Sequence, residues 1–202
     1  NWSVDVYNRP LIAIYPPDPL PPPSGRLDMT EITVFVACRT YWVDVIPREG
    51  AELQTIMAMD YNVGGGTEGF GISAPLDNSA FSFWITDPSI EENTGIPTGP
   101  VFDPALIASN LSLIVGKYSP SLGEIIVRVN GIQEGSYPYS EPLICNGQLL
   151  IGSHRGGTDQ YSGLGAFNGR IAEVVIFREA LPDDDIDYLE NYFSTKYGLV
   201  LE

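Results

Sequence analysis

The pattern of hydrophobic and polar positions predicts a chain made mostly of short β-strands. Apolar or alternating runs recur along it and are separated by Gly, Pro, Asn and Asp, which is typical of strands joined by turns. Residues 81–86 alternate, so Phe83 and Ile85 share one face of a strand and Trp84 lies on the other. Asn130-Gly131 is typical of a hairpin turn. The pattern predicts about nine or ten strands in total.

One helix is predicted near the C-terminus. Carboxylates at 183–185 lie in its first turn, where they favour the positive end of the helix dipole. Lys196 lies in the last turn, and Gly198 is placed to end the helix. The three carboxylates could also indicate a calcium site. Stabilising the start of the helix explains them more simply, because this role needs no other ligands. Apolar residues recur at helical spacing: Ile186, Leu189, Tyr192, Phe193 and Tyr197.

Many strands and one late helix indicate an all-β fold, a two-sheet antiparallel sandwich with a C-terminal α-helix. A length of 202 residues fits one such domain. Residues 1–30 differ from the rest, because six prolines occur between Pro16 and Pro23. Proline fixes φ and removes a hydrogen-bond donor, so this stretch is predicted to be extended and outside any sheet centre. The chain therefore divides into a Pro-rich arm, 1–30, and a domain, 31–202.

The arm has two interpretations. It is either a strap folded onto its own domain or an assembly arm that adds a strand to the sheet of a neighbouring subunit. In the second interpretation six apolar residues anchor it: Trp2, Val4, Val6, Leu11, Ile12 and Ile14.

The C-terminal segment resembles a known family. A Phe-x-Gly-x-Ile turn, a strand, an Ala-Leu-Pro-Asp step and a helix ending in Lys-Tyr-Gly resemble the end of laminin-G-like, concanavalin-A-like lectin–glucanase jelly-roll domains of the bacterial and phage type. Residues 32–42, 113–135 and 147–157 resemble other strands of the family, so the resemblance covers about residues 30–200. It implies a jelly roll whose helix closes one edge or end. The matching residues are Phe167, Gly169, Ile171, Glu173, Ala180, Leu181, Asp183, Lys196, Tyr197 and Gly198.

The charge of the chain excludes some classes of partner, and its cysteines allow two states. The net charge is −16, with only 10 Lys and Arg, and no basic stripe is present. Nucleic-acid binding and attachment to an anionic membrane are therefore not expected. No apolar run is long enough to span a bilayer. Cys38 and Cys145 are predicted to be buried free thiols, with a single long-range disulfide as the alternative.

Catalytic patterns are missing, so the chain is predicted not to be an enzyme. The glycosidases that it resembles place an acid and a nucleophile about 5 Å apart on one strand, in an E-x-D-x-(x)-E pattern. The predicted strands here offer only isolated acids, such as Asp60, Glu124 and Glu173. His154 is the single histidine, and no nucleophile elbow, H-E-x-x-H or C-x-x-C motif occurs.

The resemblance implies a sugar site on a sheet face or on the loop rim, where an aromatic ring stacks on the pyranose and planar polar groups bind hydroxyls. Loop 153–163 is the best candidate, because several polar residues and one tyrosine lie close together in this Gly-rich segment. For each aromatic residue, the alternative is that its ring packs within the protein and does not bind a sugar. The candidate glycan-binding residues are Tyr61, Trp84, His154, Arg155, Asp159, Gln160 and Tyr161.

An acidic loop gives a further candidate site, for Ca²⁺. Calcium needs six to eight oxygen ligands, and no EF-hand spacing is present, so the pattern is a weak one. No cofactor is predicted to be required. The candidate ligands are Asp87, Glu91, Glu92, Asn93 and Asp103.

Two functions of different classes follow. The first is a non-catalytic structural and adhesion module of a virion, filament or cell surface, which assembles with neighbouring copies or other structural subunits through residues 1–30 and also binds cell-surface glycans. The alternative is a free carbohydrate-binding, lectin-like module. A glycoside hydrolase would need a carboxylate pair that the predicted strands lack. The expected location is extracellular, at a cell surface or a virion surface.

Overall fold

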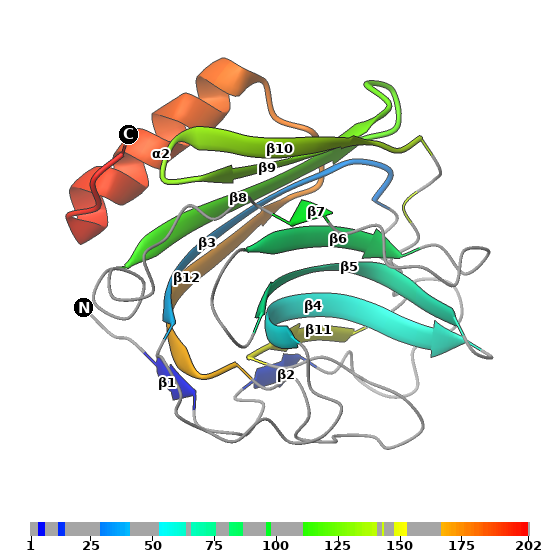
Figure 1. Ribbon diagram of the computed structural model, residues 1–202, viewed down its shortest axis with the longest axis horizontal. Coiled ribbons are helices and arrows are strands. Elements are labelled where there is room, and N and C mark those ends of the chain that lie inside the picture. The colour runs from blue at the N-terminus through cyan, green and yellow to red at the C-terminus, as the bar shows by residue number, and fades with distance from the viewer. Residues whose placement is uncertain are drawn as a thin grey trace.

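A computed structural model describes residues 4–6, 12–14, 29–40, 53–63, 66–75, 81–86, 96–97, 111–140, 143, 148–152 and 167–201. They form two six-stranded sheets, in which all paired neighbours are antiparallel, and a C-terminal helix (Figure 1). The predicted two-sheet jelly-roll sandwich is confirmed. Sheet A runs in the order β1 (Val4–Val6), β12 (Gly169–Phe177), β3 (Ile32–Thr40), β8 (Ser112–Ser119), β9 (Glu124–Val129) and β10 (Ile132–Pro138). Sheet B runs in the order β2 (Ile12–Ile14), β11 (Gln148–Ile151), β4 (Leu53–Val63), β5 (Gly66–Pro75), β6 (Ser82–Thr86) and β7 (Ile96–Pro97).

The central strand of sheet A is buried on both faces. On β3, Val34 and Val36 belong to the core between the two sheets, whereas Phe35 and Ala37 belong to a second core on the other side. Because successive side chains of a strand point to opposite faces, a strand covered on both sides reads as a continuous apolar run. The burial of β3 on both faces explains why the sequence from residue 32 is an almost continuous run of apolar residues.

Helix α2 (Asp183–Tyr197) lies over the outer face of sheet A and closes this second core (Figure 1). The rings of Phe193 and Phe35 stack with centroids 5.8 Å apart and an interplanar angle of 6°. Gly198 has φ 67° and donates its N–H to the Ser194 carbonyl, which ends the helix in the left-handed conformation open to glycine. The predicted helix is therefore confirmed, but it covers a face of sheet A, whereas the resemblance implied that it closes an edge or end of the sandwich.

Both short strands from the N-terminal 30 residues pair within the same chain. β1 pairs with β12 in sheet A, and β2 pairs with β11 in sheet B. Residues 4–6 and 12–14 thus form outer strands of their own sandwich, as in the strap interpretation. The prolines at 16–23, Trp2 and Leu11 lie outside the described residues, and assembly through the arm stays a prediction.

Two segments differ from the expected strands. The glycines of the stretch 63–71 suggest a flexible loop by composition, yet Gly66–Pro75 forms β5 in the middle of sheet B. Strand β10 was not expected, because its residues are mostly exposed and show no apolar alternation. Asn130-Gly131 joins β9 to β10 with φ values of 50° and 93°, so the predicted hairpin turn is confirmed.

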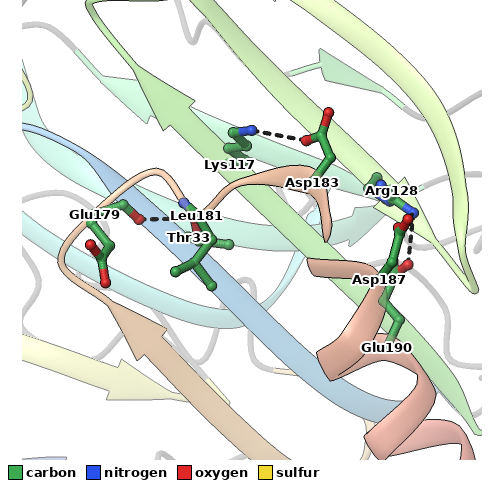
Figure 2. Close-up of polar contacts among 8 residues, drawn as sticks. All are labelled: Thr33, Lys117, Arg128, Glu179, Leu181, Asp183, Asp187 and Glu190. Atoms are coloured by element: carbon green, nitrogen blue, oxygen red, sulfur yellow. Dashed lines mark hydrogen bonds and ion pairs between the residues drawn. The ribbon is translucent and has the colours of Figure 1, made fainter. Parts of the chain in front are cut away.

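Polar contacts fix the entry to helix α2 (Figure 2). The Thr33 hydroxyl of β3 donates to the Glu179 carbonyl and accepts the N–H of Leu181, both at 2.9 Å. Lys117 of β8 donates to Asp183 at 3.0 Å. The first turn of the helix is thereby held to two strands of sheet A, and at least one of the three predicted first-turn carboxylates is bound by a lysine.

A more buried ion pair lies further along the helix. Arg128 of β9 donates to Asp187 and to Glu190, both at 2.7 Å, and also to the Gly131 carbonyl at 3.0 Å (Figure 2). Glu190 is 2% exposed, whereas the side chain of Asp183 in the Lys117 pair is 75% exposed. Removing one member of a buried pair leaves an uncompensated charge. Breaking the Arg128–Glu190 bridge should therefore lower the free energy of unfolding more than breaking the Lys117–Asp183 bridge does.

We expect Arg128→Met to lower the free energy of unfolding by about 3–5 kcal/mol, because it leaves the Glu190 carboxylate buried without its partner. The double variant Arg128→Met, Glu190→Leu should recover most of this loss, since replacing a whole buried pair by apolar groups is often close to neutral. Urea unfolding of both variants measures the difference.

The matched control is Lys117→Met, which breaks a bridge to an exposed carboxylate and should cost about 0–1 kcal/mol. Equal losses for Arg128→Met and the double variant would contradict the assignment of Arg128 and Glu190 as a coupled buried pair.

Candidate glycan-binding surface

The outer face of sheet B contains the one candidate glycan-binding aromatic whose side chain is described, Trp84. The strand register places Ala58 of β4, Gly71 of β5 and Trp84 of β6 side by side in one row. Leu150 of β11 continues the row beyond Ala58. The row lies on the face opposite Phe83, which points into the core, as the alternation of residues 81–86 predicts.

The indole of Trp84 is packed against its own sheet. A Cβ added at Gly71 would lie 2.2 Å from Cζ2 of Trp84, so only glycine leaves room for the ring at this position. The indole N–H donates to the Ser73 hydroxyl at 3.0 Å, and this hydroxyl in turn donates to Thr55 at 3.5 Å. Trp84 is only 6% exposed. The alternative of packing therefore accounts for each of these contacts, and stacking on a sugar would require the ring to become exposed.

The other predicted site residues are not brought together by the described part of the chain. Tyr61 lies in β4, where its backbone pairs with Glu68, further along the same two strands than the row of Trp84. The remaining glycan candidates (His154, Arg155, Asp159, Gln160 and Tyr161) and the calcium candidates (Asp87, Glu91, Glu92, Asn93 and Asp103) lie outside the described residues. Glycan and calcium binding at these positions stay predictions.

Metal-binding clusters and membrane-spanning helices were also sought. Within the described ranges, no group of three or more His, Cys, Asp or Glu residues is placed to hold a metal ion. The helix described here lacks the length and hydropathy needed to cross a membrane. Cys38 is a buried free thiol, as predicted, and burial raises its pKa well above the ordinary value.

The closest approach of ionisable groups to an acid–base arrangement is the Arg128–Glu190 pair. Burial raises the pKa of Glu190, while the neighbouring Arg128 opposes this rise. Its second oxygen, Oε1, has no hydrogen-bond partner among the described residues. Glu190 belongs to helix α2, however, and is almost fully buried against sheet A, so a substrate cannot reach its carboxyl group. We interpret the pair as a tether between helix and sheet.

A second polar cluster joins the end of helix α2 to β12. The carboxylate of Glu173 accepts hydrogen bonds from Lys196 and from the Tyr197 hydroxyl, both at 2.9 Å. The hydrogen bond to Glu173 raises the pKa of Lys196 above its ordinary value, so the lysine stays charged. This cluster also fixes the helix rather than presenting a reactive group.

Sequence analysis did not single out Arg39 and Arg170. The register of β3 and β12 places these two arginines directly opposite each other. Arg39 lies within a predicted strand, and Arg170 occupies a variable position of the Phe-x-Gly-x-Ile motif. Their proximity follows only from strand pairing, which cannot be read from either segment alone.

Comparisons with known proteins identify the fold but no family. No protein-family model matches the chain, and no curated protein matches its sequence. Among solved structures, the CBM40 module of the Ruminococcus gnavus IT-sialidase bound to α2,3-sialyllactose has a TM-score of 0.59 and 13% identity, over 80% of this chain and 83% of that one. The Limulus polyphemus SAP-like pentraxin has a TM-score of 0.56 and 12% identity, over 80% and 70%.

A third similar structure is a larger enzyme. The NanB sialidase of Streptococcus pneumoniae has a TM-score of 0.64 and 17% identity over 91% of this chain, but only 26% of the sialidase is covered. These likenesses confirm the two-sheet jelly-roll fold. They do not single out the laminin-G-like type, which stays a prediction.

We expect Glu190→Gln to change how stability depends on pH. The raised pKa means that the folded protein holds this proton to a higher pH than the unfolded chain. Its stabilising contribution is therefore complete below the ordinary value of 4.5 and is lost as the pH rises through the folded pKa. As the pH rises above 4.5, the stability of Glu190→Gln should fall less than that of the wild type in urea unfolding.

Glu31 gives a control of opposite sign, because a hydrogen bond from Ser119 lowers its pKa. Ionised Glu31 contributes to stability above pH 4.5, and this contribution is lost as the pH falls through the lowered folded pKa. Glu31→Gln should therefore reduce the loss of stability at acidic pH. Identical pH profiles for wild type and Glu190→Gln would mean that Glu190 does not titrate differently on folding.

We expect Trp84→Phe to destabilise the fold by about 1–3 kcal/mol, because the Ser73 hydroxyl loses a buried donor. Ser73→Ala removes the same hydrogen bond from the acceptor side and should lower stability in the same direction. Thermal unfolding and glycan titration of both variants distinguish packing from binding. A Trp84→Phe variant of normal stability that no longer binds a glycan would identify the ring as a sugar platform instead.

Proposed function

We propose that this chain is a non-catalytic carbohydrate-binding domain that recognises glycans containing sialic acid. The observation that supports it most is the likeness to the CBM40 module, which extends over most of both chains. That module has been solved with α2,3- and with α2,6-sialyllactose. The binding domain of botulinum neurotoxin DC in complex with SialylT, with a TM-score of 0.54, is a further similar structure from outside the sialidases.

A binding role is favoured over catalysis. The part of NanB that this chain resembles is about a quarter of that enzyme, as expected if a sandwich domain accompanies a separate catalytic domain. Among the described residues, Arg128 binds both Asp187 and Glu190 of helix α2, and the Glu190 side chain is almost fully buried, so the two carboxyl groups are unsuited to act together on a substrate. Most retaining glycosidases need two accessible carboxyl groups about 5 Å apart, and sialidases are an exception that uses a tyrosine nucleophile.

A role in assembly remains a second proposal. In it, residues 1–30 would mount the domain on a virion, filament or cell surface and contact other subunits. The pairing of β1 and β2 within their own sandwich makes it the weaker of the two, because these strands already use their main-chain groups intramolecularly. An extracellular location would fit either role, since cell-surface glycans are exposed there.

The test is calorimetric titration of the full chain with 3′-sialyllactose, 6′-sialyllactose and lactose. We expect a Kd of about 1 mM or tighter for the sialylated sugars, equivalent to about −4 kcal/mol, and at least tenfold weaker binding of lactose. Repeating the titration with EDTA tests whether Ca²⁺ takes part. Absence of binding to all three sugars, with and without Ca²⁺, would refute the proposal.

A further inference from the structure

Helix α2 presents two exposed tyrosines on the face that points away from sheet A. The residues buried on its inner face are Ile186, Glu190 and Phe193. Tyr188 and Tyr192 are 74% and 48% exposed, and residues four positions apart lie on the same side of a helix. In Figure 1 the helix lies at the edge of the molecule, with sheet A on one side of it. Exposed tyrosines of this kind are enriched where proteins bind partners, because the ring is apolar and the hydroxyl is polar.

Two carboxylates beside these rings are not neutralised by the described part of the chain. The helix contains five acids and one lysine. Lys117 or Arg128 binds three of the acids, and the lysine is bonded to a carboxylate of β12. The side chains of Asp184 and Asp185 form no ion pair or hydrogen bond with the described residues. They lie four and three positions before Tyr188, so they adjoin its ring. The helix dipole supplies only about half a positive charge at this end, so the face stays negative.

The other end of the same helix already holds a cation between aromatic rings and a carboxylate. The Nζ atom of Lys196 lies 5.2 Å from the centroid of the Tyr192 ring and 5.3 Å from that of Tyr197. It also donates to Glu173 at 2.9 Å. An aromatic face and a carboxylate both attract a cation, and here they act together. Tyr188 and the two aspartates before it repeat this combination, but none of the described residues supplies a cation there.

We propose that the outer face of helix α2, formed by Asp184, Asp185, Tyr188 and Tyr192, docks a basic segment of a partner protein. An arginine or lysine side chain of that segment would lie over the Tyr188 ring, next to the aspartates. Charge complementarity selects this occupant. A second copy of the chain would bring the same carboxylates opposite one another, and the carboxylate of a sialic acid would also be repelled. The surface is therefore separate from the proposed glycan-binding function.

The first experiment titrates the full chain with an amidated peptide of alternating arginine and glycine, at about 50 mM salt so that screening is moderate. We expect the double variant Tyr188→Leu, Tyr192→Leu to bind at least about fivefold more weakly than the wild type, because it loses two aromatic faces. Tyr188→Phe, Tyr192→Phe keeps both rings and should bind within about twofold of the wild type. Tyr137→Leu, which changes an exposed tyrosine of β10, should also bind within about twofold.

A second comparison separates a local charge from the overall charge of the protein. We expect Asp184→Asn to weaken peptide binding about threefold, as for the loss of one exposed ion pair. The matched control is Glu179→Gln, which removes the charge of an exposed acid that precedes the helix. It should change binding by less than about 1.5-fold, because salt screens distant charges. Equal weakening by the two variants would mean that the peptide responds only to overall charge, and would overturn the site.

Further measurements keep the other outcomes distinct. Thermal unfolding checks that each variant is folded. A wild type that does not bind the peptide, or leucine and phenylalanine double variants that bind it equally, would overturn the proposal. Light scattering that shows a dimer of the wild type and a monomer of the leucine variant would identify a second copy as the occupant instead. Loss of 3′-sialyllactose binding in the leucine variant, with peptide binding unchanged, would assign the two rings to the glycan.

Discussion

The burial of sheet A on both faces is the constraint on which the rest of this structure depends. The side chains of β3 point alternately to sheet B and to helix α2, so neither partner can be removed without exposing apolar surface. The stacking of Phe35 on Phe193 places the helix along the strand. Ion pairs from β8 and β9 then fix its position along the sheet. The C-terminal helix is therefore a third layer of the fold rather than an appendage.

This three-layer arrangement limits where a ligand can bind. Within the described part of the chain, helix α2 covers the middle of the outer face of sheet A but does not cover the outer face of sheet B (Figure 1). On sheet B, the row through Gly71 is occupied by the ring of Trp84, whose N–H is already satisfied by Ser73. An aromatic held in this way stabilises the sheet, and it differs from the exposed rings on which sugars stack.

Much of the fold could be predicted from the sequence because local signals were strong. Alternation at 81–86, the Asn-Gly turn and the helical spacing after residue 183 each depend only on neighbouring residues. Strand β10 was missed because an exposed edge strand needs no apolar alternation. Only residues 71–74 of β5 were expected to form a strand, because its glycines suggest flexibility in isolation, although Gly71 makes room for a tryptophan on the adjacent strand. These features depend on partners far away in the sequence.

The arginine pair illustrates the same limit at the level of the site. A bulge between Ile171 and Glu173 reverses the alternation of β12, so that Glu173 faces the helix rather than the core. Register across such a bulge cannot be read from periodicity, and only the paired strands bring Arg170 beside Arg39. The negative charge of the whole protein repels an anionic ligand at long range, and salt screens this repulsion. Recognition of an acidic sugar would therefore have to come from short-range contacts.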